Sequence, residues 1–547
     1  MNKLSKIILS VSLIGWALVG ILFLNSSTVV AENDAQSSNV YKQMRLFNEV
    51  LFKLRDNYVE ELDMQRLIDA AIEGMLDETD PHTNFFTPDE FEQFSTDTKG
   101  EFGGLGITIS KKGDYITVVS PMEGTPAYRV GILSGDKIAK VDGESMVGVS
   151  TNEAIKKMRG EKGTKVELEI IRPGVEEPLN FEIVRDIIKI DSVPYSFKLD
   201  DGIGYIRIRQ FNANTTEELR SSLDELETAG IRGLVIDLRF NPGGLLREAV
   251  NTVNEFVGKN KLVVFTKGRI PRANQEYYTR YNRQRSGYPI VVLINEGSAS
   301  ASEIFAGSMQ DYDRALVVGK TSFGKGSVQN LIPLSDGNAI KITTAKYYIK
   351  SGRCIHKELN DKLLKDERYR NGDYSKEELE EMRQELEEKT HNKVFYTVGG
   401  RKVYGGGGIT PDIEIDNDLL TDLGVELRRK NTFFNFSVEY MLENEDTVTE
   451  DFEADQQLVQ DFLKFAETKD IKCEETAVDS CYSWIQTELT SNIIGRKFGE
   501  TASYKISLRE DDQLQEALDL FDKYDTLPEM FDYAAKIKES KKEEKDE

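Results

Sequence analysis

Three serines lie close together where an apolar strand gives way to a helix. Residues 289–294 form a β-branched apolar run, and small and apolar residues at helical spacing follow over 299–309. Ser298, Ser300 and Ser302 fall at this junction. Free backbone N–H groups at a helix N-terminus can hold a developing oxyanion, so a serine placed there is suited to acyl chemistry. The spacing alone does not decide which of the three is the nucleophile.

A serine nucleophile needs a base, and the sequence favours lysine over histidine for this role. The three histidines of the chain are His82, His356 and His391, and the pattern places none of them beside the serines. A lysine can act as the base when burial lowers its pKa toward neutrality. Lys325 lies between two glycines in an uncharged turn, and Gln329, four positions on, could orient its amine.

A different interpretation gives these residues ordinary structural roles. Ser300 can cap a helix, Lys325 can be solvated, and Gln329 can have no role at a site. Lys325 nevertheless lies in an uncharged stretch of a chain in which 30% of the residues are charged. Because a single motif of this kind carries a real risk of a false match, the choice depends on further segments.

A second glycine-containing turn, Asn-Pro-Gly-Gly at 241–244, also joins a strand to a helix. It separates a buried strand over 233–238 from a helix over 245–256 and leaves backbone amides bare at the helix start. A phosphate-binding loop is the competing interpretation, but the GxxxxGKS/T signature is missing. Asp237 and Arg239, just before the turn, can form a structural ion pair.

Together these segments resemble the carboxyl-terminal processing, or tail-specific, serine proteases. The matching core reads SASASEIFAGSMQD and then VVGKTSFGKGSVQ. Further matches are the Asn-Pro-Gly-Gly turn after Asp-Leu-Arg and an Asp-Pro-His-Thr element near residue 80. They extend, with interruptions, from about Tyr41 to about Ile415. Several separate motifs in the expected order are far more specific than any one of them.

The resemblance implies a Ser-Lys catalytic dyad. It places the nucleophile at Ser300, the general base at Lys325 and the residue that supports this base at Gln329. The rival from another class is a non-catalytic scaffold that binds peptide ends without cutting them, and the joint presence of the three residues disfavours it. An esterase-like hydrolase is disfavoured because no GxSxG motif surrounds Ser300.

The resemblance also implies an oxyanion hole made of backbone N–H groups. One donor is assigned to Ala301, and the other to either Gly243 or Gly244, which the resemblance does not separate.

The composition indicates a multi-domain globular protein. The 547 residues suggest three or four domains at about 100–200 residues each. The net charge of -25 argues against a nucleic-acid partner, which requires a basic face. No metal-ligand spacing is visible, so neither a metal nor another cofactor is expected. The cysteines are expected to be structural; Cys473 and Cys481 could pair, which would leave Cys354 free.

The N-terminus predicts export. Lys3 and Lys6 precede an apolar stretch over 7–24, and small residues lead to Ala31. This pattern is typical of a signal peptide over 1–31, although the apolar length also just suffices for a membrane anchor. We therefore expect the periplasm or cell envelope, with attachment to the inner membrane if the segment is not cleaved.

A helical segment at 38–97, with His82 in its closing loop, precedes a domain at 98–188 that resembles a PDZ domain. Strand and turn signals alternate from 105 to 172. In PDZ domains the N–H groups of a glycine-containing loop receive a peptide's terminal carboxylate, and the peptide adds to the sheet as a strand. A plain glycine turn is the alternative for the loop on its own. The loop residues are Gly104, Leu105, Gly106 and Ile107.

The segment 189–416 is expected to form the protease core. Strands and helices alternate from 233 to 319, which is typical of a mainly parallel sheet flanked by helices. The resemblance makes this the crotonase-like, tail-specific protease type of α/β fold. A charged insert at about 357–404 departs from the family pattern. The pattern over residues 417–547 predicts a helical extension with a disordered tail. This extension could be a cap on the core or a partner-docking or regulatory module.

The combined prediction is an exported, ATP-independent serine endopeptidase. It would cleave proteins near their C-termini after the PDZ domain has bound the substrate's end. The expected partners are polypeptides with free C-termini, and an adaptor or a second copy of the chain could also bind.

Overall fold

The computed structural model describes residues 39–546, apart from positions 123, 200 and 286, most of 358–392, and 417–419. The expected signal peptide or anchor and His391 lie outside the described residues. The chain divides into two compact units, Met1–Thr79 and Asp80–Glu547, and each is described by itself. Within the described residues, no helix combines the length and the apolar character needed to cross a membrane.

The part of the first unit that the structure describes, residues 39–79, contains two helices. Residues 39–57 are helical, and α2 (Met64–Asp77) follows after a short turn. Asp63 starts α2, because its side chain accepts a hydrogen bond from the Arg66 N–H (3.1 Å). These helices confirm the helical periodicity of this stretch. Large apolar side chains of the first helix, such as Phe47, are exposed.

The second unit begins with a short strand and a capped helix. β1 (Asn84–Phe86) leads into α3 (Pro88–Lys99), which begins with a capping box formed by Thr87 and Glu90. The Thr87 N–H and hydroxyl both donate to Glu90 Oε2 at 2.9 Å. Gly100 ends the helix in the left-handed conformation, which glycine adopts without strain.

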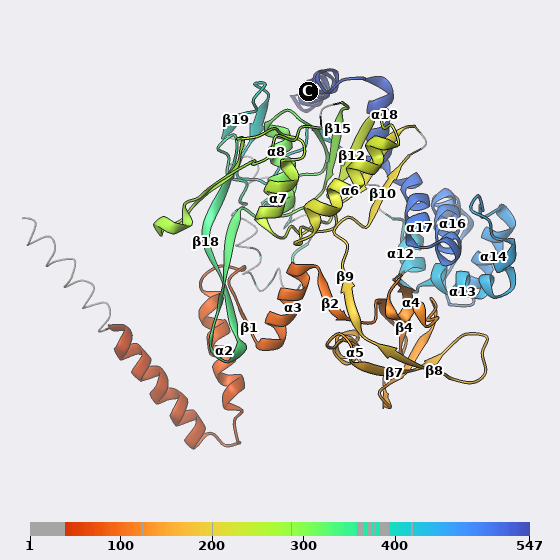
Figure 1. Ribbon diagram of the computed structural model, residues 1–547, viewed down its shortest axis with the longest axis horizontal. Helices are drawn as coiled ribbons and strands as arrows, with labels where there is room; N and C mark the ends of the chain where they lie inside the picture. Colours follow the sequence, from red (N-terminus) through yellow and green to blue (C-terminus); the bar gives the residue numbers. More distant parts are fainter. Residues whose placement is uncertain are drawn as a thin grey trace, which may run out of the picture. The chain divides into compact units, whose positions relative to one another are not determined.

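A six-stranded sheet lies at the centre of the second unit and confirms the predicted α/β class (Figure 1). All strand pairs are parallel except the one at the β10 edge. Every residue of β15 is buried, as expected for a strand covered on both faces. In spatial order the strands are β10 (Tyr195–Lys198), β11 (Ile203–Arg207), β12 (Gly233–Asp237), β15 (Ile290–Ile294), β16 (Leu316–Gly319) and β21 (Ile413–Glu414).

Three helices cover one face of this sheet. α6 (Thr215–Thr228), α7 (Leu246–Val253) and α8 (Ala301–Asp311) share a buried apolar cluster with the strands. α8 is buried along its whole length, so the sequence that follows the serines has no solvent-facing side. This burial fixes the start of α8 relative to the ends of β12 and β15.

The C-terminal helices α18 (Asp512–Lys523) and α19 (Leu527–Asp546) cover the opposite face (Figure 1). Gly233 allows α18 to approach closely, since a Cβ added there would lie 2.6 Å from ring atoms of Phe521. This part of the C-terminal extension is therefore a cap on the core. α19 continues as a helix to Asp546, whereas the charge pattern predicted a disordered tail; lysine and glutamate are also strong helix formers.

A second, antiparallel sheet was not predicted as a sheet. β18 (Ala339–Ile349) pairs with β1, β13 and β17. β17 (Ser327–Pro333) and β18 form a hairpin whose turn contains Ser335–Gly337, a Ser-Asp-Gly sequence of the kind that favours turns. β13 (Leu262–Lys267) and β14 (Glu276–Tyr278) complete the sheet.

The PDZ-like domain has the predicted order of strands and helices. β2 (Glu101–Gly104) and β9 (Asp186–Lys189) pair to form the neck through which the chain enters and leaves. In its sheet β3 is an edge strand, so one side of β3 is open to a further strand. The elements are β3 (Ile107–Lys112), β4 (Tyr115–Pro121), α4 (Pro126–Arg129), β5 (Lys137–Val141), β6 (Glu144–Ser145), α5 (Thr151–Met158), β7 (Lys165–Ile171) and β8 (Leu179–Val184).

A bundle of helices lies between the core strands and α18 in the sequence and has its own apolar clusters. Cys473 and Cys481 in this bundle are free thiols, so the pairing considered from the sequence does not form. The charged insert lies largely outside the described residues, apart from the hairpin of β19 (Val394–Tyr396) and β20 (Lys402–Tyr404). The bundle helices are α12 (Asp422–Arg429), α13 (Thr432–Asn444), α14 (Gln456–Glu467), α15 (Glu475–Asp479), α16 (Tyr482–Phe498) and α17 (Glu500–Ser507).

Candidate active site

The three serines at the start of α8 have different surroundings. The Ser298 hydroxyl donates to the Leu238 carbonyl (2.8 Å), and the Ser302 hydroxyl donates to the Asn241 carbonyl (2.9 Å). Both side chains are fully buried, so their hydroxyls serve the packing of the loops. Ser300 is only half-buried. It is the residue that remains accessible for chemistry.

Ser300 also has an unusual backbone conformation. It is the N-cap of α8, with φ 54° and ψ -112°. A residue other than glycine rarely adopts a positive φ, and such strain costs about 1–3 kcal/mol and is concentrated at functional sites. The sharp turn brings Ser300 to the end of β15, beside the open N-terminus of α8.

Glu303 joins the serine segment to the lysine segment. Its Oε2 accepts hydrogen bonds from the Ser300 N–H (2.8 Å) and the Lys325 N–H (2.9 Å). Its Oε1 accepts hydrogen bonds from the Ser322 hydroxyl (2.5 Å) and the Gly324 N–H (2.7 Å). An ionised carboxylate is an acceptor only, so these four donors match that form. The fully buried Glu303 thereby fixes the two segments side by side.

Two opposing effects set the protonation of Glu303. Burial penalises the charged form and raises the pKa of Glu303 to about 7, although the hydrogen bonds from Ser322, Gly324, Ser300 and Lys325 favour the charge. A group with this pKa changes its charge near neutral pH. The geometry of the site can therefore respond to pH in that range.

Tyr347 of β18 provides a second link between the same segments. Its hydroxyl oxygen lies 3.0 Å from the Ser300 carbonyl oxygen and 2.5 Å from the Lys325 carbonyl oxygen. Tyr347 is buried, and burial raises the pKa of this hydroxyl well above its ordinary value, so the hydroxyl stays a donor. The backbones of Ser300 and Lys325 thus converge on one hydroxyl and one carboxylate.

Lys325 lies in the loop before β17, and its residue is half-buried. Its positive charge helps burial to lower the pKa of Lys341 on β18. Lys325 and Lys341 are therefore close enough for their charges to interact.

Gln329 lies on β17 beyond a register shift at Val328/Gln329. This irregularity interrupts the strand alternation that would put Gln329 on one face with Lys325. The Gln329 amide donates to the hydroxyls of Ser327 (2.8 Å) and Thr343 (3.3 Å). The Thr343 hydroxyl donates in turn to Asp80 Oδ1 (3.0 Å), which links Gln329 to the Asp-Pro-His-Thr element.

One histidine lies nearer to the lysine loop than the sequence pattern indicated. A Cβ added at Gly326 would lie 2.6 Å from the His356 backbone nitrogen, so His356 runs alongside this loop. The Lys357 N–H donates to the Gly324 carbonyl (2.8 Å) in the same contact. The His82 N–H, in contrast, donates to Asp80 as part of a loop. A separation of 30 residues in the sequence concealed the approach of His356.

The Asn-Pro-Gly-Gly turn lies directly against Ser300. A Cβ added at Gly243 would lie 2.7 Å from Ser300 Cβ and 2.8 Å from the Ala301 nitrogen, so only glycine fits there. The Gly243 N–H donates to Asn241 Oδ1 (2.9 Å). Among the described residues, none accepts a hydrogen bond from the N–H of Gly244 or of Ala301.

The expected ion pair of Asp237 and Arg239 forms and is buried. Arg239 Nη2 lies 2.7 Å from Asp237 Oδ2. Burial opposes the charge on Asp237, but the neighbouring arginines outweigh it and lower the pKa of Asp237 to about 2. The pair lies at the end of β12, just before the Asn-Pro-Gly-Gly turn, and neither side chain hydrogen-bonds to Ser300.

The four candidate peptide-binding residues take different positions. Gly104 belongs to β2 and Ile107 to β3, which leaves Leu105 and Gly106 as the loop. The Leu105 and Gly106 carbonyls accept hydrogen bonds from α4 and its approach, at 3.0 and 2.9 Å. Within the described part of the chain, no residue accepts a bond from their N–H groups. The loop amides are therefore available to an anion beside the open edge of β3.

Two residues central to this geometry were not identified from the sequence. Glu303 had a detectable signal, because Ser-Ala-Ser-Glu fits the S-x-x-E pattern of a capping box. Tyr347 had none, since its approach depends on the pairing of β17 with β18. Within the described residues, no group of His, Cys, Asp and Glu is arranged to hold a metal ion.

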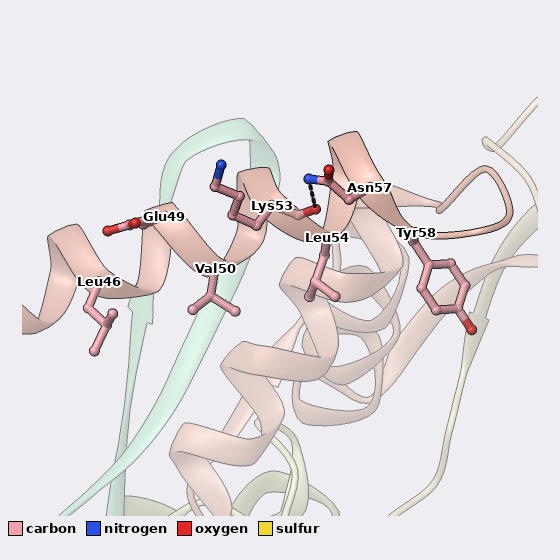
Figure 2. A pocket seen from close by; sticks show the side chains of 7 residues that line it. All are labelled: Leu46, Glu49, Val50, Lys53, Leu54, Asn57 and Tyr58. Carbon is pink, nitrogen blue, oxygen red and sulfur yellow. Dashed lines mark hydrogen bonds between the residues drawn. The ribbon is translucent and has the colours of Figure 1, made fainter.

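The cavity shown in Figure 2 belongs to the first unit, and its lining residues include no serine, cysteine or histidine. Its lining side chains come from one helix and the turn after it, and run from Leu46 to Tyr58. Leu46, Val50 and Leu54 form its apolar part. The candidate active site is consequently the Ser300–Lys325 region.

Family models match three segments of the chain. The model described as peptidase family S41 matches residues 202–363, and a PDZ domain model matches residues 95–171. A model described as a family of unknown function matches residues 425–499, within the helical bundle.

The alignments with two curated relatives cover most of the length of each relative. A carboxy-terminal-processing protease of Bartonella bacilliformis is 42% identical over 341 residues, which are 61% of this chain and 78% of that protein. The carboxy-terminal processing protease CtpA of Bacillus subtilis is 35% identical, covering 65% of this chain and 75% of that protein. A solved structure titled photosystem II D1 C-terminal processing protease is 31% identical, with a TM-score of 0.34, and covers 56% of this chain and 83% of that chain. The chain therefore belongs to the carboxy-terminal processing proteases of peptidase family S41, which are serine-type peptidases, and carries a PDZ domain.

Proposed function

We propose that the protein is an endopeptidase with a Ser300–Lys325 dyad that cleaves polypeptides near their C-termini without ATP. The observation that carries this proposal is the joint attachment of both segments to Glu303 and Tyr347. No other serine at the helix start combines accessibility with backbone strain. The dyad thus rests on convergent backbone geometry as well as on family membership.

In the proposed reaction, Ser300 Oγ attacks the carbonyl carbon while the neutral Lys325 amine accepts the hydroxyl proton. The tetrahedral oxyanion accepts hydrogen bonds from the N–H groups of Ala301 and Gly244. We choose Gly244 over Gly243 because the Gly243 N–H already donates to Asn241. The Lys325 ammonium then protonates the leaving amine as the C–N bond breaks, and a water activated by Lys325 hydrolyses the acyl-enzyme.

The PDZ domain would select the substrate. A peptide end can place its carboxylate on the amides of Leu105 and Gly106 and add as a strand to β3. The open edge of β3 and the inward-facing loop carbonyls support this mode. We propose that Gln329 acts through Thr343 and Asp80 to support the lysine loop, because these are the groups that it contacts.

Substitution of the dyad tests the mechanism. Ser300→Ala and Lys325→Ala should each lower cleavage of unfolded casein by at least about a thousandfold with the fold intact. Lys325→Arg should be equally inactive, because a guanidinium does not lose its proton at working pH. Ser480→Ala and Lys259→Ala, which change exposed residues, are the matched controls. Full cleavage by purified Lys325→Ala would end the dyad proposal.

The same assay separates the enzyme from a non-catalytic scaffold. A scaffold would bind a peptide ending in a free carboxylate, and wild-type protein would leave casein uncut on a gel. Loss of binding after amidation of the peptide, measured with the Ser300→Ala protein, would assign recognition to the terminal carboxylate.

We further propose that the protein is exported to the periplasm or cell envelope, on the basis of the N-terminal sequence. The exposed apolar side chains of the helix over 39–57 also offer a surface to an adaptor or a second copy of the chain (Figure 2). N-terminal sequencing of the protein recovered from cells tests cleavage after Ala31. Light scattering of wild-type and Phe47→Glu protein tests self-association.

A further inference from the structure

A buried network of charges connects the end of β12 with the C-terminal helices. Arg239 Nη1 and Nη2 donate to Asp511 Oδ1 (2.7 Å) and Oδ2 (2.6 Å), a bidentate pair. Arg239 Nη1 also donates to Gln513 Oε1 (3.2 Å). Arg239 is 7% exposed and Gln513 is fully buried. Residues far along the chain thus supply three of the oxygens that Arg239 contacts.

Arg239 leads directly into the Asn-Pro-Gly-Gly turn. The next residue, Phe240, has φ 56° although it is bulky and 63% exposed. Such strain persists only where the surroundings over-determine the backbone. The Arg239 N–H donates to Asp237 (2.8 Å) and the Phe240 N–H to Asn295 (2.8 Å), so side chains hold the strained residue from both sides.

Asp511 both caps α18 and pairs with Arg239. It is the N-cap of α18, and its Oδ1 accepts a hydrogen bond from the Leu514 N–H (3.0 Å) as well as from Arg239. Without the Asp511 carboxylate, Arg239 and Arg207 would share the carboxylate of Asp237, and this imbalance of buried charge drives rearrangement. The residues that would move first are the strained ones next to Arg239.

We infer that Asp511 is a positioning residue for the proposed reaction, acting through Arg239 on the turn at 240–244. This inference rests on the proposed function, since the turn matters for catalysis only if Gly244 donates to the oxyanion. It makes the start of α18 part of the apparatus that sets the oxyanion hole. The C-terminal extension then has a role in catalysis in addition to covering the sheet.

Two substitutions test this role while keeping the helix cap. Asp511→Asn and Asp511→Ser both retain a good N-cap residue but remove the carboxylate from Arg239. We expect kcat for a peptide substrate to fall about tenfold to a hundredfold with KM within twofold of wild type, because a displaced donor stabilises only the transition state less. Inhibition by a peptide boronate, whose tetrahedral oxygen would occupy the oxyanion hole, should weaken by the same factor.

Two control variants separate positioning from stability. Asp522→Asn removes the exposed ion pair with Arg232 from the same helix and should leave kcat unchanged. Phe521→Leu loosens the packing of α18 without touching Arg239, and should lower the melting temperature but not kcat per folded molecule. The folded fraction of each variant is measured by circular dichroism, and kcat is referred to it.

The outcomes distinguish this inference from the proposed function. If wild-type activity depends on Ser300 but both Asp511 variants keep wild-type kcat and boronate affinity, the positioning role is wrong and the dyad stands. An equal loss of kcat in Phe521→Leu also overturns it, because stability alone would then explain the effect. If Ser300→Ala retains activity, the proposed function itself fails.

Discussion

Ser300 and Glu303 illustrate how a few residues can establish a reactive arrangement. The strained backbone of Ser300 is held by Glu303, which also accepts the N–H of Lys325. The sequence motifs identified Ser300 and Lys325 as candidates, but the role of Glu303 depends on its hydrogen bonds to a loop about twenty residues later in the chain. The sequence therefore predicted which residues are candidates for the site, whereas the contacts between the two segments could be known only from the fold.

Glu303→Gln should disrupt the site. The amide keeps one acceptor oxygen but turns the other acceptor into a donor, which then faces two donors. We expect activity at pH 8 to fall about tenfold to a hundredfold by steady-state assay with an unfolded substrate. Glu248→Gln on α7, which removes a carboxylate that accepts three hydrogen bonds, is the matched control and should stay within twofold. Unchanged activity in Glu303→Gln would contradict the bridging role.

The raised pKa of Glu303 predicts that its contribution to stability depends on pH. Between its ordinary value and about 7, the folded protein holds a proton there that the unfolded chain has lost. The contribution of Glu303 to the free energy of unfolding therefore falls as pH rises toward 7. Relative to wild type, the melting temperature of Glu303→Gln should be lowest near pH 5 and recover above pH 7. A difference that is constant with pH would show that Glu303 does not titrate in this range.

At the scale of elements, the sequence was sufficient to predict those helices, strands and turns that depend on residues adjacent in the chain. The alternation of strands and turns in the PDZ-like domain was predicted, and the capping box of Thr87 and Glu90 and the turn at 335–337 likewise depend on residues adjacent in sequence. β13 was missed because its partner β18 lies about eighty positions away, and β14, which pairs with β13, was missed with it. Gln329 was expected to share a face with Lys325 in either a strand or a helix, and the register shift before it could not be read from the sequence.

The loop before β3 provides a prediction for substrate binding. A Cβ added at Gly106 would lie 2.3 Å from Thr125 Cβ, and Gly106 has φ 77°. Gly106→Ala should therefore displace the loop and weaken binding of a C-terminal peptide at least tenfold. Gly113 has φ 60° but open space around it, so Gly113→Ala controls for backbone strain alone. Calorimetric titration of the full chain carrying Ser300→Ala measures both; equal affinities would contradict the assignment of the loop.

At the scale of the second unit, the core sheet is completed by the end of the chain. The sequence identified the helices that follow the strands directly, α6 to α8. It did not show that α18 and α19 cover the other face, because amphipathic helices carry no signal for the surface that they cover. The alternatives left open for the extension are thus resolved differently for its parts. The last two helices cap the sheet, whereas α12 to α16 have a separate apolar core.

Phe521→Ala tests the contribution of this cap. Removal of a buried phenylalanine costs about 3–5 kcal/mol, so the melting temperature should fall by several degrees. Asp522→Ala, next to it on the exposed side of α18, should change stability by less than about 0.5 kcal/mol. Differential scanning calorimetry compares the two. A fall of similar size in both would show that the packing of Phe521 is not what holds the helix.

The placement of α19 has a consequence for the order in which the core is completed during synthesis. Met530 and Ala534 of α19 are buried against the sheet in a cluster that begins with Ile203 of β11. Because these residues are translated more than 300 positions after β11, the sheet face that they cover is exposed to water until they have been made. The folding of this face is therefore completed only late in translation.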